Sequence, residues 1–234
     1  MSAHFPEFGA VILDMDGLAL DTEPAYTDAW QRAARDLGVE LTAEACGLLA
    51  GYHADHVRGE FQRMMGDRFD PARFYPLAEA YWRESVRRGI ARMPGLDELL
   101  ELLARRGIPH LLATNSDRRY ALECLQRAGA DALIAGMVCR SDVARGKPEP
   151  DLILEAAHRL RTEPSRCLVL EDSAAGLVAA DRAGALPVLV HGKPGRDRLL
   201  SLARWYFRDL HEVVAWLEPS RNRSSVPERP ALNA

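Results

Sequence analysis

The sequence has few cysteines and no arrangement of them that binds metal or forms a disulfide framework. Cys46, Cys124, Cys139 and Cys167 are scattered singly, without a Cys-x-x-Cys pair or a histidine at zinc spacing. This pattern argues against a structural zinc site and against a small protein held together by disulfides. We therefore expect four reduced thiols inside the core.

Long hydrophobic runs and an excess of one charge are also missing. No run approaches the roughly 18 apolar residues that a membrane-spanning helix needs, and no signal-like stretch precedes Asp14. The net charge is −4, from 30 basic and 34 acidic side chains mixed along the chain. This balance argues against nucleic-acid or membrane partners. A cytoplasmic monomer is the default expectation.

A short apolar run near the N-terminus ends abruptly in acids. Val11, Ile12 and Leu13 are followed by Asp14 and then by Asp16 and Gly17. This is typical of a buried parallel strand whose carboxyl end opens into a crevice. Two carboxylates so close are costly to ionise together unless a cation or a shared proton relieves them. The alternative is a strand with an ordinary polar turn.

After this strand the chain changes to helical periodicity. Apolar residues recur at helical spacing and β-branched residues are sparse. The pattern predicts a helix over about 24–38, a second that Thr42 caps, and two more over about 54–65 and 71–88. Residues 21–90 are therefore expected to form an all-helical insert.

From Met93 onward, strands and helices alternate. Helices are predicted over about 96–106, 150–160 and 174–183, and another runs through Leu122 and Leu125 to Gly129. Strands are predicted over 110–113, about 133–139, 167–170 and 187–190. Such alternation indicates an α/β fold with a doubly wound parallel sheet. With 234 residues, 47% of them hydrophobic, the chain can bury the core of one large domain with an insert. We expect that core in 1–20 and 91–218, and a disordered tail over 219–234.

Four polar clusters lie at or just beyond the predicted strand ends. Parallel strands bring these ends to one edge of a sheet. Three of the carboxylates, Asp14, Glu171 and Asp172, supply hard oxygens that suit magnesium. Hydroxyl, amide and ammonium groups suit phosphate oxygens. Together they indicate phosphoryl transfer, with an Asp that can become an acyl phosphate. The clusters are Asp14/Asp16, Thr114-Asn115-Ser116, Gly146-Lys147-Pro148 and Glu171-Asp172-Ser173.

Each cluster taken alone has a plainer interpretation. The Thr114 and Glu171 clusters could cap the helices that follow them, and Lys147 could be a solvated loop lysine. All four in this order at one sheet edge are more simply explained by a common site.

These motifs resemble those of the haloacid dehalogenase superfamily, in its β-phosphoglucomutase-like and phosphoglycolate-phosphatase-like branch. Asp14-x-Asp16-Gly17 with Asp21-Thr22-Glu23-Pro24 looks like the first motif and its cap hinge, and Thr114-Asn115-Ser116 like the second. Lys147 looks like the third motif, and the stretch from Glu171 to Gly184 like the fourth. The resemblance spans about 11–190. It implies a Rossmann-like core, with the insert as a helical cap that opens and closes.

The resemblance also implies a role for each motif residue. Asp14 would be the nucleophile and Asp16 the general acid and base. Mg²⁺ would be held by Asp14, the backbone carbonyl of Asp16 and Asp172, with Glu171 acting through water. The phosphoryl oxygens would contact Thr114, Asn115 and Lys147. Members that cleave carbon–halogen bonds or phosphonates lack an acid at the position of Asp16, so a phosphate ester is expected.

Residues of the insert should select the substrate. Candidate contacts are Tyr26, His53, His56 and Arg58, each with ordinary surface exposure as the alternative. β-Phosphoglucomutase has Lys and Arg where this chain has Ala50 and Ala54, and a hinge histidine where it has Tyr26. These departures favour a phosphatase of a small phosphorylated metabolite, such as a sugar phosphate, a polyol phosphate or phosphoglycolate. The alternatives are a phosphosugar mutase and a non-catalytic phosphate-binding regulator.

Overall fold

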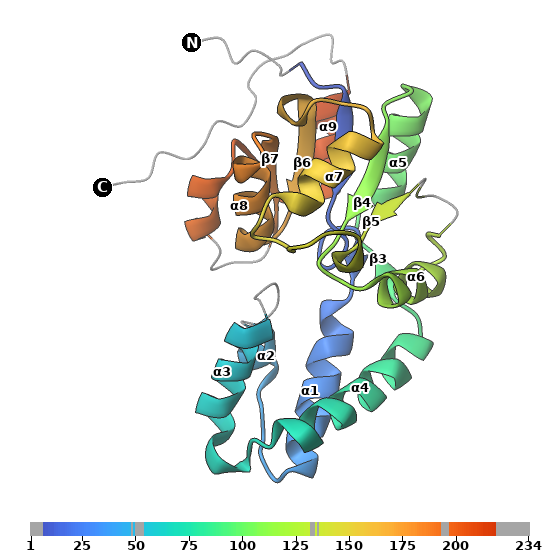
Figure 1. The fold of residues 1–234 in the computed structure, drawn as a ribbon. Helices are drawn as coiled ribbons and strands as arrows, with labels where there is room; N and C mark the ends of the chain where they lie inside the picture. The colour runs from blue at the N-terminus through green and yellow to red at the C-terminus, as the bar shows by residue number, and fades with distance from the viewer. Residues whose placement is uncertain are drawn as a thin grey trace.

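A six-stranded parallel sheet with helices on both faces forms the larger part of the protein, and four helices project from one end of it (Figure 1). The structure is a computed structural model. It describes residues 7–47, 49, 54–131, 134, 136–192 and 197–218, with 54–56 and 197–198 described by their backbone alone.

The first strand lies inside the sheet, between strands from distant parts of the chain. The sheet order is β5-β4-β1-β6-β7-β8, and every pairing is parallel. Strands β4 and β5 lie on one side of β1, and β6, β7 and β8 lie on the other. The strand order therefore reverses at β1, and open α/β sheets bind their ligands at such a point. The strands are β1 (Ala10–Leu13), β4 (His110–Ala113), β5 (Met137–Val138), β6 (Cys167–Glu171), β7 (Leu186–Val190) and β8 (Trp205–Phe207).

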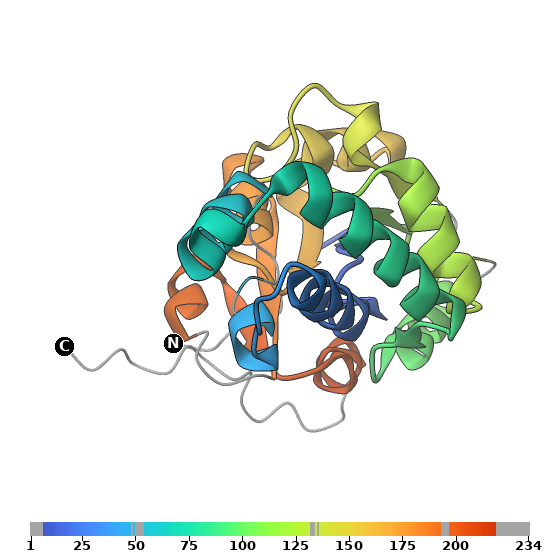
Figure 2. The same ribbon diagram turned by 90° about the horizontal axis from the view of Figure 1, so that it is seen from below.

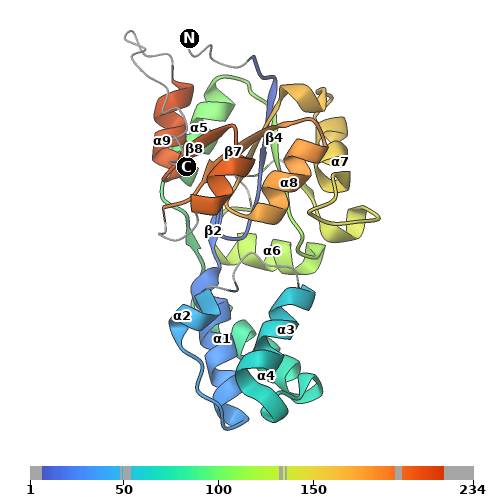
Figure 3. The same cartoon turned by 90° about the vertical axis from the view of Figure 1, so that its left-hand side faces the viewer.

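Alternate residues of β1 enter two different cores. Ala10 and Ile12 pack with α7 (Asp151–Arg159) and α8 (Ala174–Arg182). Val11 and Leu13 pack with the helices of the opposite face. All four side chains are fully buried, as expected for a strand covered on both faces. The helices of that opposite face are α5 (Leu96–Arg105), α6 (Arg118–Arg127) and α9 (Leu210–Leu217) (Figure 3).

The helical insert is joined to the sheet by a small antiparallel ribbon. Strands β2 (Leu20–Asp21) and β3 (Ala91–Arg92) pair side by side, so the chain enters and leaves the insert at one place. Between them lie α1 (Glu23–Asp36), α2 (Ala43–Gly47), α3 (Ala54–Met65) and α4 (Pro71–Arg87).

The insert has a hydrophobic core of its own, in which the rings of Phe61 and Phe74 lie 4.7 Å apart. Seen from below, α1 and α4 lie over the middle of the larger unit (Figure 2). These features confirm the predicted fold class, an α/β core with an inserted helical cap. The exact domain limits at 20 and 91 stay a prediction.

Most predicted elements are present within one or two residues, and the structure departs from the prediction in three places. The strand predicted over 133–139 is reduced to Met137–Val138, and residues 132, 133 and 135 lie outside the described part. Strand β8 and helix α9 were not predicted. The described residues also include four short 3₁₀ helices: η1 (Gly66–Arg68), η2 (Arg140–Asp142), η3 (Pro164–Arg166) and η4 (Asp197–Leu202).

The expectations for thiols and membrane helices can also be compared with the structure. All four cysteines are free and buried, which confirms the expectation of reduced core thiols. Among the helices that the structure describes, none is long and apolar enough to cross a membrane. The predicted disordered tail, 219–234, lies outside the described residues.

Candidate active site

A buried lysine lies between two carboxylates at the carboxyl edge of the sheet. Lys147 Nζ donates to Asp14 Oδ1 at 2.5 Å, to the backbone oxygen of Ala113 at 2.7 Å, and to Glu171 Oε1. Lys147 is 4% exposed and Glu171 fully buried. Lys147 is therefore not a solvated loop lysine, and the plainer interpretation of that motif is wrong. The first, third and fourth motifs, which contain Asp14, Lys147 and Glu171, therefore meet at one edge of the sheet.

The loop that carries Lys147 is held by the second motif. The side-chain amide of Asn115 donates to the backbone oxygen of Lys147 at 3.0 Å and accepts from its backbone nitrogen at 2.7 Å. Gly146 makes room for this contact, because a Cβ there would lie 2.4 Å from Asn115 Oδ1. Asn115, predicted to contact phosphate, thus fixes the position of the lysine in this structure.

Glu171 ends strand β6 and is fixed by the helix that follows. Ser173 donates from Oγ to Glu171 Oε2 at 2.9 Å and accepts from the backbone nitrogen of Gly176 at 3.1 Å. Ser173 is therefore the N-cap of α8. The interpretation of this motif as a helix cap is correct for Ser173. Glu171 takes no part in the cap, because both of its oxygens accept side-chain hydrogen bonds within the site.

Three buried carboxylates form a cluster with the chemistry of a metal site. Asp14, Glu171 and Asp172 each offer an oxygen, and these oxygens all lie within 4.8 Å of one another. Among the described residues, the ammonium of Lys147 is the one lysine paired with them, so the formal charge of this group stays negative. An all-oxygen, negatively charged pocket fits a hard divalent cation. Asp172 approaches the turn after β1 closely, since a Cβ on Gly17 would lie 2.5 Å from Asp172 Oδ2.

The electrostatics of the cluster agree with this excess of negative charge. Burial and the nearby charges of Glu171 and Asp172 raise the pKa of Asp14 well above its ordinary value, although Lys147 acts against them. Burial works to lower the pKa of Lys147, but its ion pairs with Asp14 and Glu171 prevail and raise it. The lysine is therefore charged, and the carboxylates beside it gain from any further positive charge.

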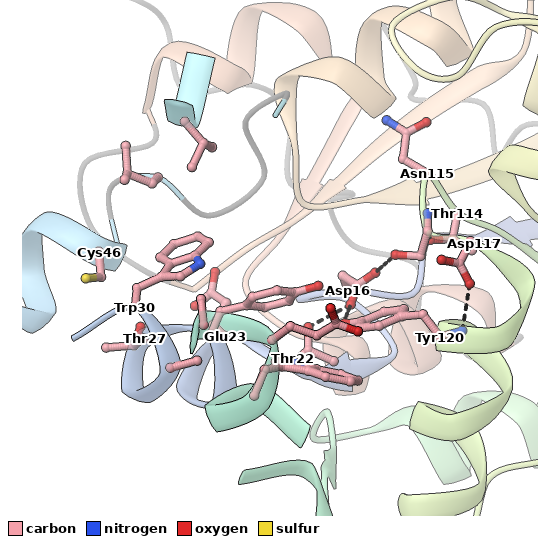
Figure 4. A pocket seen from close by; sticks show the side chains of 18 of the residues that line it. Asp16, Thr22, Glu23, Thr27, Trp30, Cys46, Thr114, Asn115, Asp117 and Tyr120 are labelled. Atoms are coloured by element: carbon pink, nitrogen blue, oxygen red, sulfur yellow. Dashed lines mark hydrogen bonds between the residues drawn. The ribbon is translucent and has the colours of Figure 1, made fainter. Parts of the chain in front are cut away.

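Asp16 accepts hydrogen bonds from three hydroxyl groups. Its Oδ1 accepts from Thr22 Oγ1 and from the phenol of Tyr120, and its Oδ2 accepts from Ser116 Oγ, each at 2.8 Å. Figure 4 shows Asp16 with Thr22 and Tyr120 at one end of the pocket. Thr22 precedes α1 of the insert, whereas Ser116 and Tyr120 belong to the sheet-containing core. The side chain of Asp16 is thus bonded to both parts of the protein.

Sequence reasoning did not predict these partners of Asp16. Thr22 and Ser116 lie within motifs that were singled out, but nothing in the sequence connected them with Asp16. Nothing in the sequence marks Tyr120 as a partner of Asp16. It is recognisable only as a residue in the first turn of the helix that follows the second motif.

The second motif itself does not cap that helix. Asp117 is the N-cap of α6 and accepts from the backbone nitrogen of Tyr120 at 2.9 Å. The helix-cap interpretation of Thr114-Asn115-Ser116 is therefore wrong. Thr114 is instead buried at the end of β4, where its Oγ1 accepts from the backbone nitrogen of Ser116 at 3.0 Å.

A cavity of about 820 Å³ joins these groups to the insert. Asp14, Asp16, Thr114, Asn115, Lys147 and Asp172 lie at its core end. Tyr26 and Arg58 line it from the insert, and their contact with a substrate stays a prediction. His53 lies outside the described residues, and so does the side chain of His56. Much of the insert side is aromatic, because Tyr26, Trp30 and Trp82 all line the cavity. Trp30 is labelled in Figure 4.

The fold and this site define a class of enzyme, the phosphate-transferring α/β hydrolases with an inserted cap. The family model for haloacid dehalogenase-like hydrolases matches residues 8–184. The chain belongs to this superfamily, and within it to the phosphatases that hydrolyse phosphoric monoesters.

Two relatives illustrate this membership, and one solved structure shares the fold. A phosphorylated carbohydrates phosphatase of Thermotoga maritima is 31% identical, with 75% of this chain and 81% of that protein covered. Hexitol phosphatase A of Escherichia coli is also 31% identical, with coverages of 80% and 85%. The crystal structure of a Clostridium difficile β-phosphoglucomutase, at 21% identity, shares the fold. Its TM-score is 0.71, with 88% of this chain and 93% of that chain covered.

Proposed function

We propose that this protein is a Mg²⁺-dependent phosphatase of small phosphorylated metabolites that acts through an aspartyl phosphate on Asp14. The observation that carries the proposal is the buried group of Asp14, Lys147, Glu171 and Asp172 beside Asp16, at the end of a cavity large enough for a metabolite. The two relatives named as phosphatases of phosphorylated carbohydrates and of hexitol phosphates support the substrate class.

In the first half of the reaction, a carboxylate oxygen of Asp14 attacks phosphorus and the bond to the leaving oxygen breaks. Asp16 gives its proton to that oxygen, which departs as a hydroxyl. The three hydroxyls around Asp16 can each turn to accept as well as donate, so they accommodate its carboxyl and carboxylate forms. Such acid–base help is typically worth about 10²–10⁴ in rate.

In the second half, water attacks phosphorus and the bond to Asp14 breaks. Asp16 takes the proton of the water, which returns both aspartates to their starting states. Lys147 offsets the repulsion between the carboxylate of Asp14 and the phosphoryl oxygens. The hydroxyl of Thr114 and the amide of Asn115 lie at the same end of the cavity, where they can donate to those oxygens.

The cation would be held by carboxylate oxygens of Asp14 and Asp172 and by the backbone oxygen of Asp16, with Glu171 acting through water. Bound there, Mg²⁺ would supply positive charge against the phosphoryl oxygens. Glu171 already uses both of its oxygens to accept from Lys147 and Ser173. This engagement supports an indirect role for Glu171.

The experiment that tests the proposal is phosphate release from a panel of sugar phosphates, polyol phosphates and phosphoglycolate. Wild type and Asp14→Asn are compared in Mg²⁺ and in EDTA. We expect Mg²⁺-dependent turnover that the substitution abolishes, together with an acid-quenched phosphoenzyme that hydroxylamine cleaves. Activity that needs a sugar bisphosphate primer would favour the mutase instead. Turnover that survives in Asp14→Asn would contradict the nucleophile.

A further inference from the structure

The insert is packed against the core as well as joined to it by the β2–β3 ribbon. Trp82 and Val86 of α4 belong to the hydrophobic cluster that contains Leu13 of β1. The cluster around Phe61 and Phe74, inside the insert, is a separate one. Helix α6 lies at the end of the core that faces the insert (Figure 3) and contacts α4. The C-terminal half of α4 is therefore packed as a part of the core.

Three aromatic rings meet where α1 and α4 face α6. The ring centroids of Tyr120, from α6, and Trp82, from α4, lie 4.8 Å apart, with their planes tilted by 32°. Tyr26 of α1 lies 6.2 Å from each of them. Aromatic pairs at such distances attract one another and favour particular orientations. Two rings of the insert therefore confine the ring of Tyr120 from one side.

The far end of the Tyr120 ring donates a hydrogen bond to Asp16. The phenol oxygen lies 2.8 Å from Asp16 Oδ1, and burial and the charge of Asp16 raise the pKa of Tyr120, so the phenol stays a donor. The hydroxyls of Thr22 and Ser116, which also donate to Asp16, are one bond away from Cβ. The phenol oxygen lies at the end of a long side chain, so a small rotation of the ring moves it further. Because a hydrogen bond weakens steeply with misalignment, contacts with the ring decide how well Tyr120 holds Asp16.

We propose that Trp82, with Tyr26, is a positioning residue for the general acid: the two rings hold Tyr120 where its phenol donates to Asp16. The inference rests on the proposed function, because it takes Asp16 as the group that protonates the leaving oxygen. An acid must lie within hydrogen-bond reach of the atom that it protonates. Loss of the Trp82 ring therefore weakens this proton transfer, although neither ring needs to touch the reacting atoms.

The first test compares two esters of similar size whose leaving groups differ in their need for a proton. 4-Nitrophenol leaves readily as an anion, whereas the alcohol of benzyl phosphate must be protonated as it departs. We measure kcat/KM, which covers the steps up to the departure of the leaving group, in Mg²⁺. For Trp82→Leu we expect a fall of about three- to tenfold on benzyl phosphate and a change within about twofold on 4-nitrophenyl phosphate. Equal losses on both esters, or no loss on either, would overturn the proposal.

Reference variants separate this inference from the proposed function. Asp16→Asn removes the acid itself and should show the same preference for the 4-nitrophenyl ester in larger form. Trp82→Phe keeps a ring against Tyr120 and should recover most of the loss on benzyl phosphate. If Asp16→Asn lacks the preference, the acid role of Asp16 fails, and the inference fails with it. If Asp16→Asn shows the preference and Trp82→Leu does not, only the inference fails.

The second test asks whether Trp82 acts through Tyr120. Trp82→Leu and Tyr120→Phe are measured singly and together on the best substrate of the phosphate-release panel. If Trp82 acts through the phenol, the double variant should have a kcat within about twofold of that of Tyr120→Phe, because the hydrogen bond can be lost only once. Losses that multiply would show that Trp82 acts in another way, and a rise in KM alone would make it a substrate contact. Either result would overturn the proposal.

A tryptophan far along the chain serves as the matched control. Trp205 of β8 packs against Trp216, with ring centroids 5.4 Å apart, and both lie outside the residues that line the cavity. Trp205→Leu should keep the wild-type ratio between the two esters, whatever it does to the melting temperature. Thermal melting shows whether each variant is folded. Tyr26→Leu, which removes the second ring, should show the same preference as Trp82→Leu and decides the matter if that variant does not fold.

Discussion

Gly176 lies against Glu171 so closely that a Cβ on residue 176 would be 1.8 Å from Cδ of the glutamate. Helix α8 can therefore approach the end of β6 only with glycine at this position. The contact explains how a buried carboxylate is kept beside Lys147, because the helix confines it from one side while Ser173 donates to it.

Gly176→Ala is expected to destabilise the protein, although alanine is the better helix former. The added methyl must displace Glu171 or the helix, at a cost of about 1–3 kcal/mol. Gly59→Ala is the matched control, because Gly59 also lies in a helix, α3, and a Cβ there meets nothing within 4 Å. That variant should gain about 0.5–1 kcal/mol. Urea unfolding of the two variants, followed by circular dichroism, measures both effects, and equal stabilities would contradict the prediction.

Tyr120→Phe is expected to lower kcat about tenfold and to leave KM nearly unchanged. The variant keeps the ring but removes one of the three hydroxyls that hold Asp16, and one such hydrogen bond is worth about 1.4 kcal/mol or more in the barrier. Steady-state kinetics on the best substrate measures kcat and KM separately and so checks this expectation. Tyr206→Phe also removes a hydroxyl, one that donates to the backbone of His191, and should keep wild-type kinetics. A rise in KM alone for Tyr120→Phe would show that the phenol contacts the substrate instead of positioning Asp16.

The four thiols are expected to be inert in the native protein at pH 8. Burial raises the pKa of Cys124 to about 12 and that of Cys46 and Cys167 to about 11. A thiol with a pKa of about 12 is ionised in about one molecule in 10⁴ at pH 8, and only the thiolate reacts. A colorimetric thiol reagent should therefore label native protein slowly, and should count all four thiols in 6 M guanidinium. Rapid labelling of one native thiol would show that this thiol is exposed or that its pKa is lower.

Local signals in the sequence were sufficient for most of the sheet and most of the insert. Val11–Leu13 is apolar throughout because the strand is covered on both faces, and such a run is recognisable without a structure. Strand β8 was missed because it is short. It has only three residues, Trp205–Phe207, two of them half-buried, and so short an apolar run does not identify a strand.

The site could be predicted as a set of residues but not as a set of contacts. The order of Asp14, Lys147 and Asp172 at strand ends identified the sheet edge, because topology alone brings parallel strand ends together. That Asn115 holds the backbone of Lys147 depends on the path of a loop, which no local pattern encodes. Tyr120 reaches Asp16 from a residue 104 positions away, so its role follows from packing and not from a motif.

Mg²⁺ is expected to raise the melting temperature of the wild-type protein and to have little effect on Asp172→Asn. In EDTA, one lysine of the described part of the chain, Lys147, balances the cluster of Asp14, Glu171 and Asp172. The charge of Asp172 is among those that raise the pKa of Asp14. At about one hundred times its Kd, Mg²⁺ should stabilise the folded state by about 2.7 kcal/mol, or about 5–10 °C for a chain of this size.

The substitution removes one ligand and one repelling charge together. Asp172→Asn in EDTA should therefore melt at or above the wild-type temperature, and adding Mg²⁺ should shift it by less than about 2 °C. Asp142 is the matched control, because it is a carboxylate paired with Arg118 and Arg159 outside the cluster. In Asp142→Asn, Mg²⁺ should raise the melting temperature as much as in wild type, since this variant keeps every proposed Mg²⁺ ligand. An equal Mg²⁺ shift in wild type and Asp172→Asn would place the cation elsewhere, because binding at this cluster needs the carboxylate of Asp172.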